Sequence, residues 1–192
     1  DELSAEGEPT GKRVTTKDYS EATRYYMNKS SLPKVVGGFN TNVTFKSFDM
    51  NILMNFSFGS YLYDSVYASL MNGFESPGRN GHPNLKNRWQ NPGDKTDVPL
   101  FLNEQNDFNA TSSRFLFKNN YLRVRGLNLG YTFDENWMEN YQIQGLRVYL
   151  QGDNIFTFQS HKGIDPEQEL SGLTNNRSHQ MKTISLGVNI QL

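Results

Sequence analysis

Apolar and polar residues alternate in several regions of the chain, and the most regular region is the last one. From Ser185 to Leu192, polar or small side chains alternate strictly with aliphatic ones. This two-residue period is that of a β-strand with one apolar face. We therefore predict a strand over 184–192, which ties the end of the chain into a sheet rather than leaving it in water.

The same period predicts four earlier strands. The first two form a hairpin with a tight turn at Ser47 and Phe48. In the third, the apolar positions change from even to odd numbers, and a β-bulge at Gly126 is the simplest cause. The predicted strands before the last are 34–46, 49–59, 115–133 and 144–158.

The segments between these strands are polar. Residues 1–33 are predicted to form a loop with a short helix over 18–28, and 60–114 is too rich in Gly, Pro, Asn and Asp for a regular strand or a long helix. Residues 134–142 form a second short connection, and 159–181 form another polar loop. Long and short connections therefore alternate, as in outer-membrane barrels with brief periplasmic turns and extended outer loops.

This alternation assigns a side of the membrane to each loop. We expect 1–33 to be an extracellular segment and 34–192 to be barrel, with 60–114 and 159–181 as long extracellular loops. The fold class predicted is all-β, an antiparallel transmembrane β-barrel. Five strands cannot close a barrel, which in bacterial single chains needs an even number and at least about eight. We therefore predict that the chain supplies about five C-terminal strands of a larger barrel.

Composition agrees with a barrel wall and excludes several other classes. Only 35% of the residues are hydrophobic and the mean hydropathy is −0.69, which fits strands with one wet face and long loops. No apolar run approaches the roughly 18 residues of a membrane helix. A net charge of −1 gives no reason to expect nucleic acid as a partner. The chain has no cysteine and its three histidines are scattered, so we expect no thiolate or zinc site and no cofactor.

The spacing of the last residues resembles the C-terminal assembly signal of Gram-negative outer-membrane β-barrels. The residues that match are Ser185, Gly187, Ile190 and Leu192, where Leu192 stands in place of the usual aromatic residue. The resemblance implies two partners, the barrel assembly machinery and outer-membrane lipid.

Ordered motifs along most of the chain resemble the SusC/RagA-like TonB-dependent outer-membrane transporters. They are Pro33 with Gly37-Gly38-Phe39, Lys46-Ser47-Phe48-Asp49, Arg88-Trp89-Gln90-Asn91-Pro92-Gly93-Asp94, Thr96-Asp97-Val98-Pro99, Tyr121-Leu122-Arg123-Val124, Leu127-Asn128-Leu129-Gly130-Tyr131, Leu146-Arg147-Val148-Tyr149, Asn154-Ile155-Phe156-Thr157 and Gly163-Ile164-Asp165-Pro166-Glu167.

This resemblance implies a location, partners and a function. The fold would be a barrel of roughly 22 strands with a plugged lumen, located in the cell outer membrane. The function would be TonB-driven import of oligosaccharides or oligopeptides, with a SusD-like surface lipoprotein as the lid. The N-terminal strands, the plug and the segment that contacts TonB would belong to the rest of the same transporter.

Four loop residues are candidates for contact with substrate or lid. Trp89 is either a packed loop anchor or a contact to ligand or lid. Asp94, Asp97 and Asp165, with Glu167, carry oxygen ligands for a hard cation or a carboxylate pair for glycoside cleavage. Turn formation beside Gly93 and Pro166 is the simpler explanation for Asp94 and Asp165.

Three arginines are expected on one lumen wall or rim. Arg123, Arg125 and Arg147 could pair with carboxylates of the plug or steer an anionic substrate. Structural ion pairing is the default expectation for them.

Two other classes of protein remain as alternatives. A soluble β-sandwich, such as a carbohydrate-binding module, also has strands with one apolar face, because alternation does not distinguish a core from lipid. An outer-membrane enzyme would need a nucleophile beside a base, and no spacing of Ser and His in the sequence indicates such a pair. We therefore expect that the protein is not an enzyme.

Overall fold

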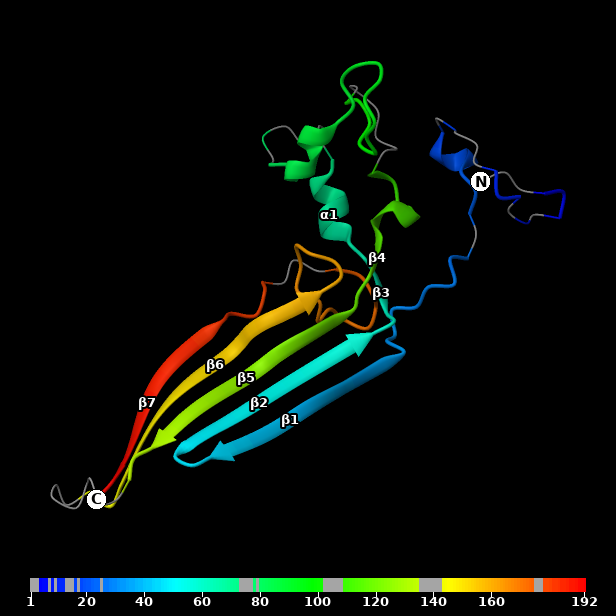
Figure 1. The fold of residues 1–192 in the computed structure, drawn as a ribbon. Coiled ribbons are helices and arrows are strands. Elements are labelled where there is room, and N and C mark those ends of the chain that lie inside the picture. Colours follow the sequence, from blue (N-terminus) through cyan, green and yellow to red (C-terminus); the bar gives the residue numbers. More distant parts are fainter. Residues whose placement is uncertain are drawn as a thin grey trace. The chain divides into compact units, whose positions relative to one another are not determined.

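A computed structural model shows the chain as two compact units (Figure 1). The sheet unit comprises Ser30–Leu62, Phe117–Gly172 and Asn176–Leu192, and the loop unit comprises Asp1–Lys29, Tyr63–Leu116 and Leu173–Asn175. The structure describes residues 4–6, 8, 10–12, 16, 18–24, 26–72, 78, 80–101, 109–134, 143–174 and 178–192.

The sheet unit is built on one five-stranded antiparallel sheet in the order β1-β2-β5-β6-β7 (Figure 1). All five strands that the alternation predicts are present, four of them within a few residues of the predicted bounds and the third shortened at its start. They are β1 (Val35–Phe45), β2 (Phe48–Phe58), β5 (Tyr121–Thr132), β6 (Gly145–Gln159) and β7 (Thr183–Gln191).

Two local predictions in this unit are wrong. The β1–β2 turn lies at Lys46 and Ser47 instead of Ser47 and Phe48, because Lys46 adopts a positive φ of 53° and Phe45 pairs with Phe48. The predicted strand over 115–133 is two strands, β4 (Leu116–Lys118) and β5, separated at Asn119 and Asn120. Of the predicted connection over 134–142, residues 135–142 lie outside the described residues.

The predicted bulge is confirmed beside Gly126. Leu53 pairs with Gly126 and Met54 pairs with Val124, so Arg125 is the extra residue of β5 against β2. Across β6, the pairing also shifts between Val124 and Gly126. The bulge reconciles the even and odd apolar positions of β5, since it keeps both sets on one face of the sheet.

One face of the sheet is apolar and exposed. Leu129 and Leu150 face each other across β5 and β6, and Leu150 pairs with Leu186 on β7; these three side chains are 41%, 43% and 74% exposed. Phe39 and Val43 of β1 lie on the same face and are also exposed. The apolar stripes are therefore not stacked inward on a second layer, as they would be in a β-sandwich.

The loop unit has short elements around a small core. They are the 3₁₀ turns η1 (Tyr19–Glu21), η2 (Pro83–Asn87) and η4 (Ser113–Phe115), and the helix α1 (Ser65–Leu70). Buried Ala68, Met71, Val98 and Phe115 form the core. Asp64 caps α1 by accepting a hydrogen bond from the Tyr67 amide. Among the described residues, no helix is long and apolar enough to cross a membrane.

Two predictions for the loops need correction. Among the described residues of the predicted helix over 18–28, only η1 is helical: Asp18 caps the turn through Ser20, and Ala22 is already extended. The segment 60–114, predicted without a regular strand, begins with β3 (Tyr61–Tyr63), which pairs with β4 in a two-stranded sheet. Both elements are three residues long, below the length at which periodicity gives a signal.

Candidate functional site

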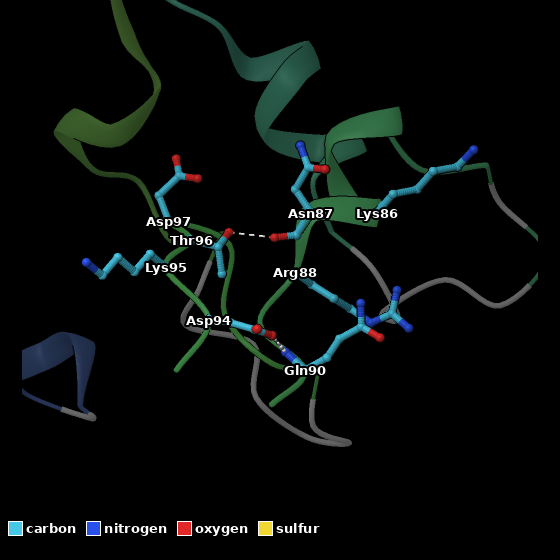
Figure 2. A pocket seen from close by; sticks show the side chains of 8 residues that line it. All are labelled: Lys86, Asn87, Arg88, Gln90, Asp94, Lys95, Thr96 and Asp97. Carbon is cyan, nitrogen blue, oxygen red and sulfur yellow. Dashed lines mark hydrogen bonds between the residues drawn. The ribbon is translucent and has the colours of Figure 1, made fainter. Parts of the chain in front are cut away.

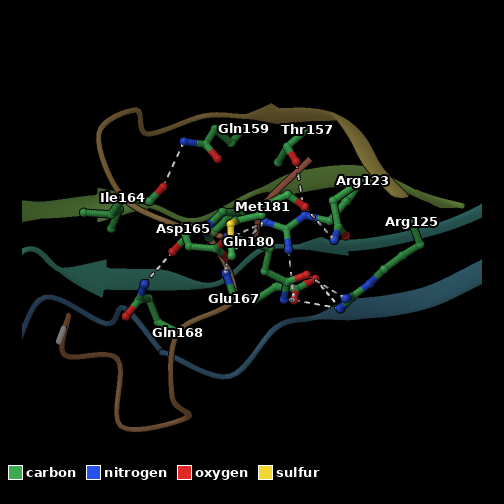
Figure 3. A network of polar contacts seen from close by, with 12 residues as sticks. Arg123, Arg125, Thr157, Gln159, Ile164, Asp165, Glu167, Gln168, Gln180 and Met181 are labelled. Atoms are coloured by element: carbon green, nitrogen blue, oxygen red, sulfur yellow. Dashed lines mark hydrogen bonds and ion pairs between the residues drawn. The ribbon is translucent and has the colours of Figure 1, made fainter. Parts of the chain in front are cut away.

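Two arginines of β5 and two carboxylates of a following loop form a polar cluster on the sheet unit (Figure 3). We call Arg123, Arg125, Asp165, Glu167 and Gln180 the arginine–carboxylate cluster. Arg123 Nη2 donates to both Asp165 oxygens, at 3.0 and 2.9 Å. Arg125 Nη2 likewise donates to both Glu167 oxygens, at 2.8 and 2.7 Å. Because residues two apart on a strand share a face, β5 presents both guanidinium groups to the same loop.

Burial makes the Arg123–Asp165 pair the centre of this cluster. Arg123 is 2% exposed and Asp165 is 5% exposed. Arg123 Nε also donates to Thr157 Oγ1 of β6 at 3.1 Å, and its Nη1 lies 3.1 Å from Glu167 Oε2. A buried pair is maintained only where each charge keeps its partners, so the loop is fixed to the sheet at this point.

Backbone groups hold Asp165 ionised. Burial raises the pKa of its carboxyl, but hydrogen bonds from the Glu167 and Gln180 amides and from the Arg123 guanidinium outweigh it, so the net pKa lies below its ordinary value. The Gln180 side chain completes the cluster, since its Nε2 donates to Glu167 and its Oε1 accepts from Arg125.

A second ion pair crosses three strands at the other end of the sheet. Arg147 of β6 reaches over β5 to Asp49 of β2, with Nε to Oδ1 at 3.0 Å and Nη2 to Oδ2 at 2.6 Å. Gly130 lies below it: a Cβ there would come within 2.3 Å of Arg147 Nη2 and 2.4 Å of Asp49 Oδ1. Asn128 of β5 also accepts from Arg147. The three arginines predicted on one wall are therefore all paired within the chain.

The loop unit contains a shallow hollow formed by residues 86–97 (Figure 2). Asp94 closes its turn by accepting hydrogen bonds from the amides of Asn91 and Gln90, which lower the pKa of its carboxyl. Thr96 Oγ1 donates to the Asn87 carbonyl across the hollow. Lysines, an arginine and aspartates line it, so it presents mixed charge: Lys86, Arg88, Lys95, Asp94 and Asp97.

The sequence matches no model of a known protein family. It is similar to two TonB-dependent receptors: P3 of Formosa agariphila, 26% identical over 204 residues, and SusC of Bacteroides thetaiotaomicron, 29% identical over 169 residues. These matches cover 98% and 86% of the chain but only 20% and 16% of the relatives. The structure of the RagAB peptide importer in its closed-closed state superposes with a TM-score of 0.76 at 26% identity, over 98% of this chain and 20% of that one.

These comparisons confirm the predicted resemblance to the SusC/RagA-like TonB-dependent transporters. The chain spans about a fifth of the length of the relatives it matches. Its five-stranded sheet is part of a transmembrane β-barrel wall, which explains why the sheet is open and why its apolar face is uncovered.

The structure places the predicted site residues of this chain in different surroundings. Asp94 and Asp97 line the hollow of the loop unit, whereas Trp89 is half-buried and its amide donates to the Val98 carbonyl. Asp165 lies in the arginine–carboxylate cluster of the sheet unit. Ser185, Gly187 and Ile190 lie on β7 and pair with β6.

The cation hypothesis gains no support from these positions. Asp165 and Glu167 are each engaged by an arginine, and no group of three or more His, Asp or Glu residues in the described part of the chain could hold a metal ion.

Sequence reasoning missed the roles of Thr157 and Gln180 as partners of the arginines. A polar residue beside an arginine on the wet face of a neighbouring strand is the signal that could have identified Thr157.

The depressed pKa of Asp165 predicts how the cluster responds to pH. A carboxyl whose pKa is lowered on folding contributes stability above its unfolded pKa of about 3.9, and this contribution is lost as pH falls through the lower folded pKa. We expect protection of the Glu167 and Gln180 amides, which donate to Asp165, from hydrogen exchange to be unchanged between about pH 5 and 8, after correction for the intrinsic rate. Loss of protection already at pH 6 would contradict this assignment.

Proposed function

We propose that the chain forms part of the lumen wall of an outer-membrane nutrient importer. The observation that carries this proposal is the pair of faces of one sheet: exposed aliphatic side chains on one side, and ion pairs that hold a loop on the other. The first face suits acyl chains and the second suits a wet conduit. The similarity to SusC and to the RagAB peptide importer supports the same assignment.

The proposed orientation follows from the connections. The tight Lys46–Ser47 turn would face the periplasm, and the segments 1–33, 60–114 and 159–181 would lie on the outer side. A SusD-like lipoprotein would cover the outer mouth, and TonB would act through the rest of the transporter. Trp89, Asp94, Asp97 and Asp165 remain candidates for contact with substrate or lid, and β7 remains the candidate assembly signal, with the barrel assembly machinery as its partner.

Uptake by the complete transporter tests this proposal. We expect deletion of its gene to abolish growth on one class of polymer, either oligopeptides or oligosaccharides, and restoration of the gene to recover it. The purified transporter should migrate faster in an unboiled gel than after boiling, as folded barrels do, and should carry a surface lipoprotein. Unchanged growth on both classes, together with migration unaffected by heat, would overturn the proposal.

A further inference from the structure

A cavity of about 320 Å³ lies beside the arginine–carboxylate cluster, within the sheet unit. Asn55 and Ser57 of β2 and Tyr121 of β5 line it from the polar face of the sheet. The loop that carries Glu167 forms another wall, and Ser31 ties that loop down by donating to the Leu170 carbonyl at 2.7 Å. The ion pairs that fix the loop therefore also shape the cavity.

Three polar groups of this lining have no partner among the described residues. Glu167 accepts a hydrogen bond from Asn55 Nδ2 at 3.0 Å, which fixes the amide so that Oδ1 is the remaining group, and this oxygen is buried and unpaired. The hydroxyls of Ser57, which is 6% exposed, and Tyr121 also form no hydrogen bond in the described part of the chain. A buried polar group without a partner is uncommon and costly, so Asn55 Oδ1 is the group that most needs a ligand, and the two hydroxyls are free to bond to the same ligand.

The charges around the cavity indicate a neutral ligand group. Arg125 and Glu167 neutralise each other in a bidentate pair, and Gln180 bonds to both. A charged group entering here would have to displace one of them. Pro33, Leu62 and Leu170 add apolar lining, which suits a ligand that alternates polar and apolar atoms.

The spacing of the unpaired groups favours an extended peptide. Asn55 and Ser57 are two residues apart on one strand, so they repeat along it at roughly 6.6 Å. The backbone N–H and C=O groups on one edge of an extended peptide repeat at the same distance. A peptide that lies along β2 could thus bond to both residues in the same register.

We infer that this cavity is a subsite for the neutral backbone of an oligopeptide cargo, with Asn55, Ser57 and Tyr121 as its hydrogen-bonding groups. The inference rests on the proposed function and makes it more specific. Asn55 Oδ1 accepts from a peptide N–H, whereas the hydroxyls of Ser57 and Tyr121 donate to peptide carbonyls or accept from amides.

The test compares peptide binding to the purified, complete transporter with binding to a variant that lacks the hydroxyl groups of Ser57 and Tyr121. The probes are oligoalanines of about three to eight residues, matched against malto-oligosaccharides of the same range. We expect Ser57→Ala with Tyr121→Phe to weaken oligoalanine binding about tenfold or more, since each lost hydrogen bond typically weakens binding severalfold. The melting temperature should be unchanged, because neither hydroxyl has an intramolecular partner.

A matched control distinguishes the outcomes. Ser47→Ala with Tyr131→Phe removes the same two groups at the Lys46–Ser47 turn and on the apolar face, and should leave binding as in the parent protein. Equal oligoalanine affinity of the Ser57/Tyr121 variant and the parent would overturn the subsite, as would weakened binding of the sugars alone. A parent transporter that imports neither class contradicts the proposed function instead.

Discussion

Replacing Arg123 with methionine should release the loop that carries Asp165 and cost about 3–5 kcal/mol of stability. The reason is burial: both side chains are more than nine-tenths covered, and Asp165 would keep its charge with only backbone donors. Removing one partner of a buried ion pair leaves an uncompensated charge, which is more costly than the pair itself is favourable. We expect the substitution to be the most destabilising change on the polar face.

Hydrogen exchange and thermal unfolding of the complete transporter measure this effect. In Arg123→Met the amides of 164–170 should exchange faster, while those in the middle of β5 and β6 stay protected. Arg125→Gln is the matched control, since the Arg125 side chain is about one-third exposed and its loss should cost far less. Adding Asp165→Leu to Arg123→Met should recover stability, because a hydrophobic pair replaces the stranded carboxylate. Equal effects of the two arginine substitutions would show that burial is not what makes Arg123 important.

The strands could be predicted from the sequence because successive side chains point to opposite faces of a sheet. When one face is apolar and the other polar, the residues alternate in the same way. This held even at the bulge, where the change of parity around Gly126 marks the extra residue Arg125. It failed at Asn119 and Asn120, where alternation predicts one continuous strand. Their side chains bond to distant groups, the Pro166 carbonyl and the Gly59 amide, and alternation contains no information about such contacts.

The candidate site could be predicted only in part, for the same reason. The sequence singles out Asp165 and Glu167 as possible oxygen ligands or a possible carboxylate pair, with turn formation as the simpler explanation for Asp165, and it predicts Arg123 and Arg125 on a lumen wall or rim. Their mutual pairing joins residues 42 positions apart. Nothing in the local spacing specifies it, so plug carboxylates were equally acceptable partners. A general rule could have favoured pairing within the chain. Two arginines close together on the polar face of a strand need carboxylates nearby if they are to be buried.

The pattern also left open what lies against the apolar face, and this decided the class of protein. A sandwich core and acyl chains select the same residues. In the structure, Leu129, Leu150 and Leu186 are too exposed for a core position, and the similarity to barrel transporters explains the exposure. A charge placed on each face in turn therefore tests the central assignment directly.

Leu150→Arg and Gln151→Arg should have opposite outcomes although the two positions are adjacent on β6. Leu150 lies between Leu129 and Leu186 on the exposed apolar face, so an arginine there would enter the hydrocarbon, at about 2–4 kcal/mol near the bilayer midplane. Gln151 faces the polar side, pairs with Asn128 and donates to Asp153, so an arginine would find water and a carboxylate. Assembly of the complete transporter, measured as the fraction that resists unfolding in an unboiled gel, should fall for Leu150→Arg and stay near the parent value for Gln151→Arg. Equal assembly of both variants would place water on both faces of the sheet, and greater damage from Gln151→Arg would mean that the polar face, not the apolar one, is the packed side.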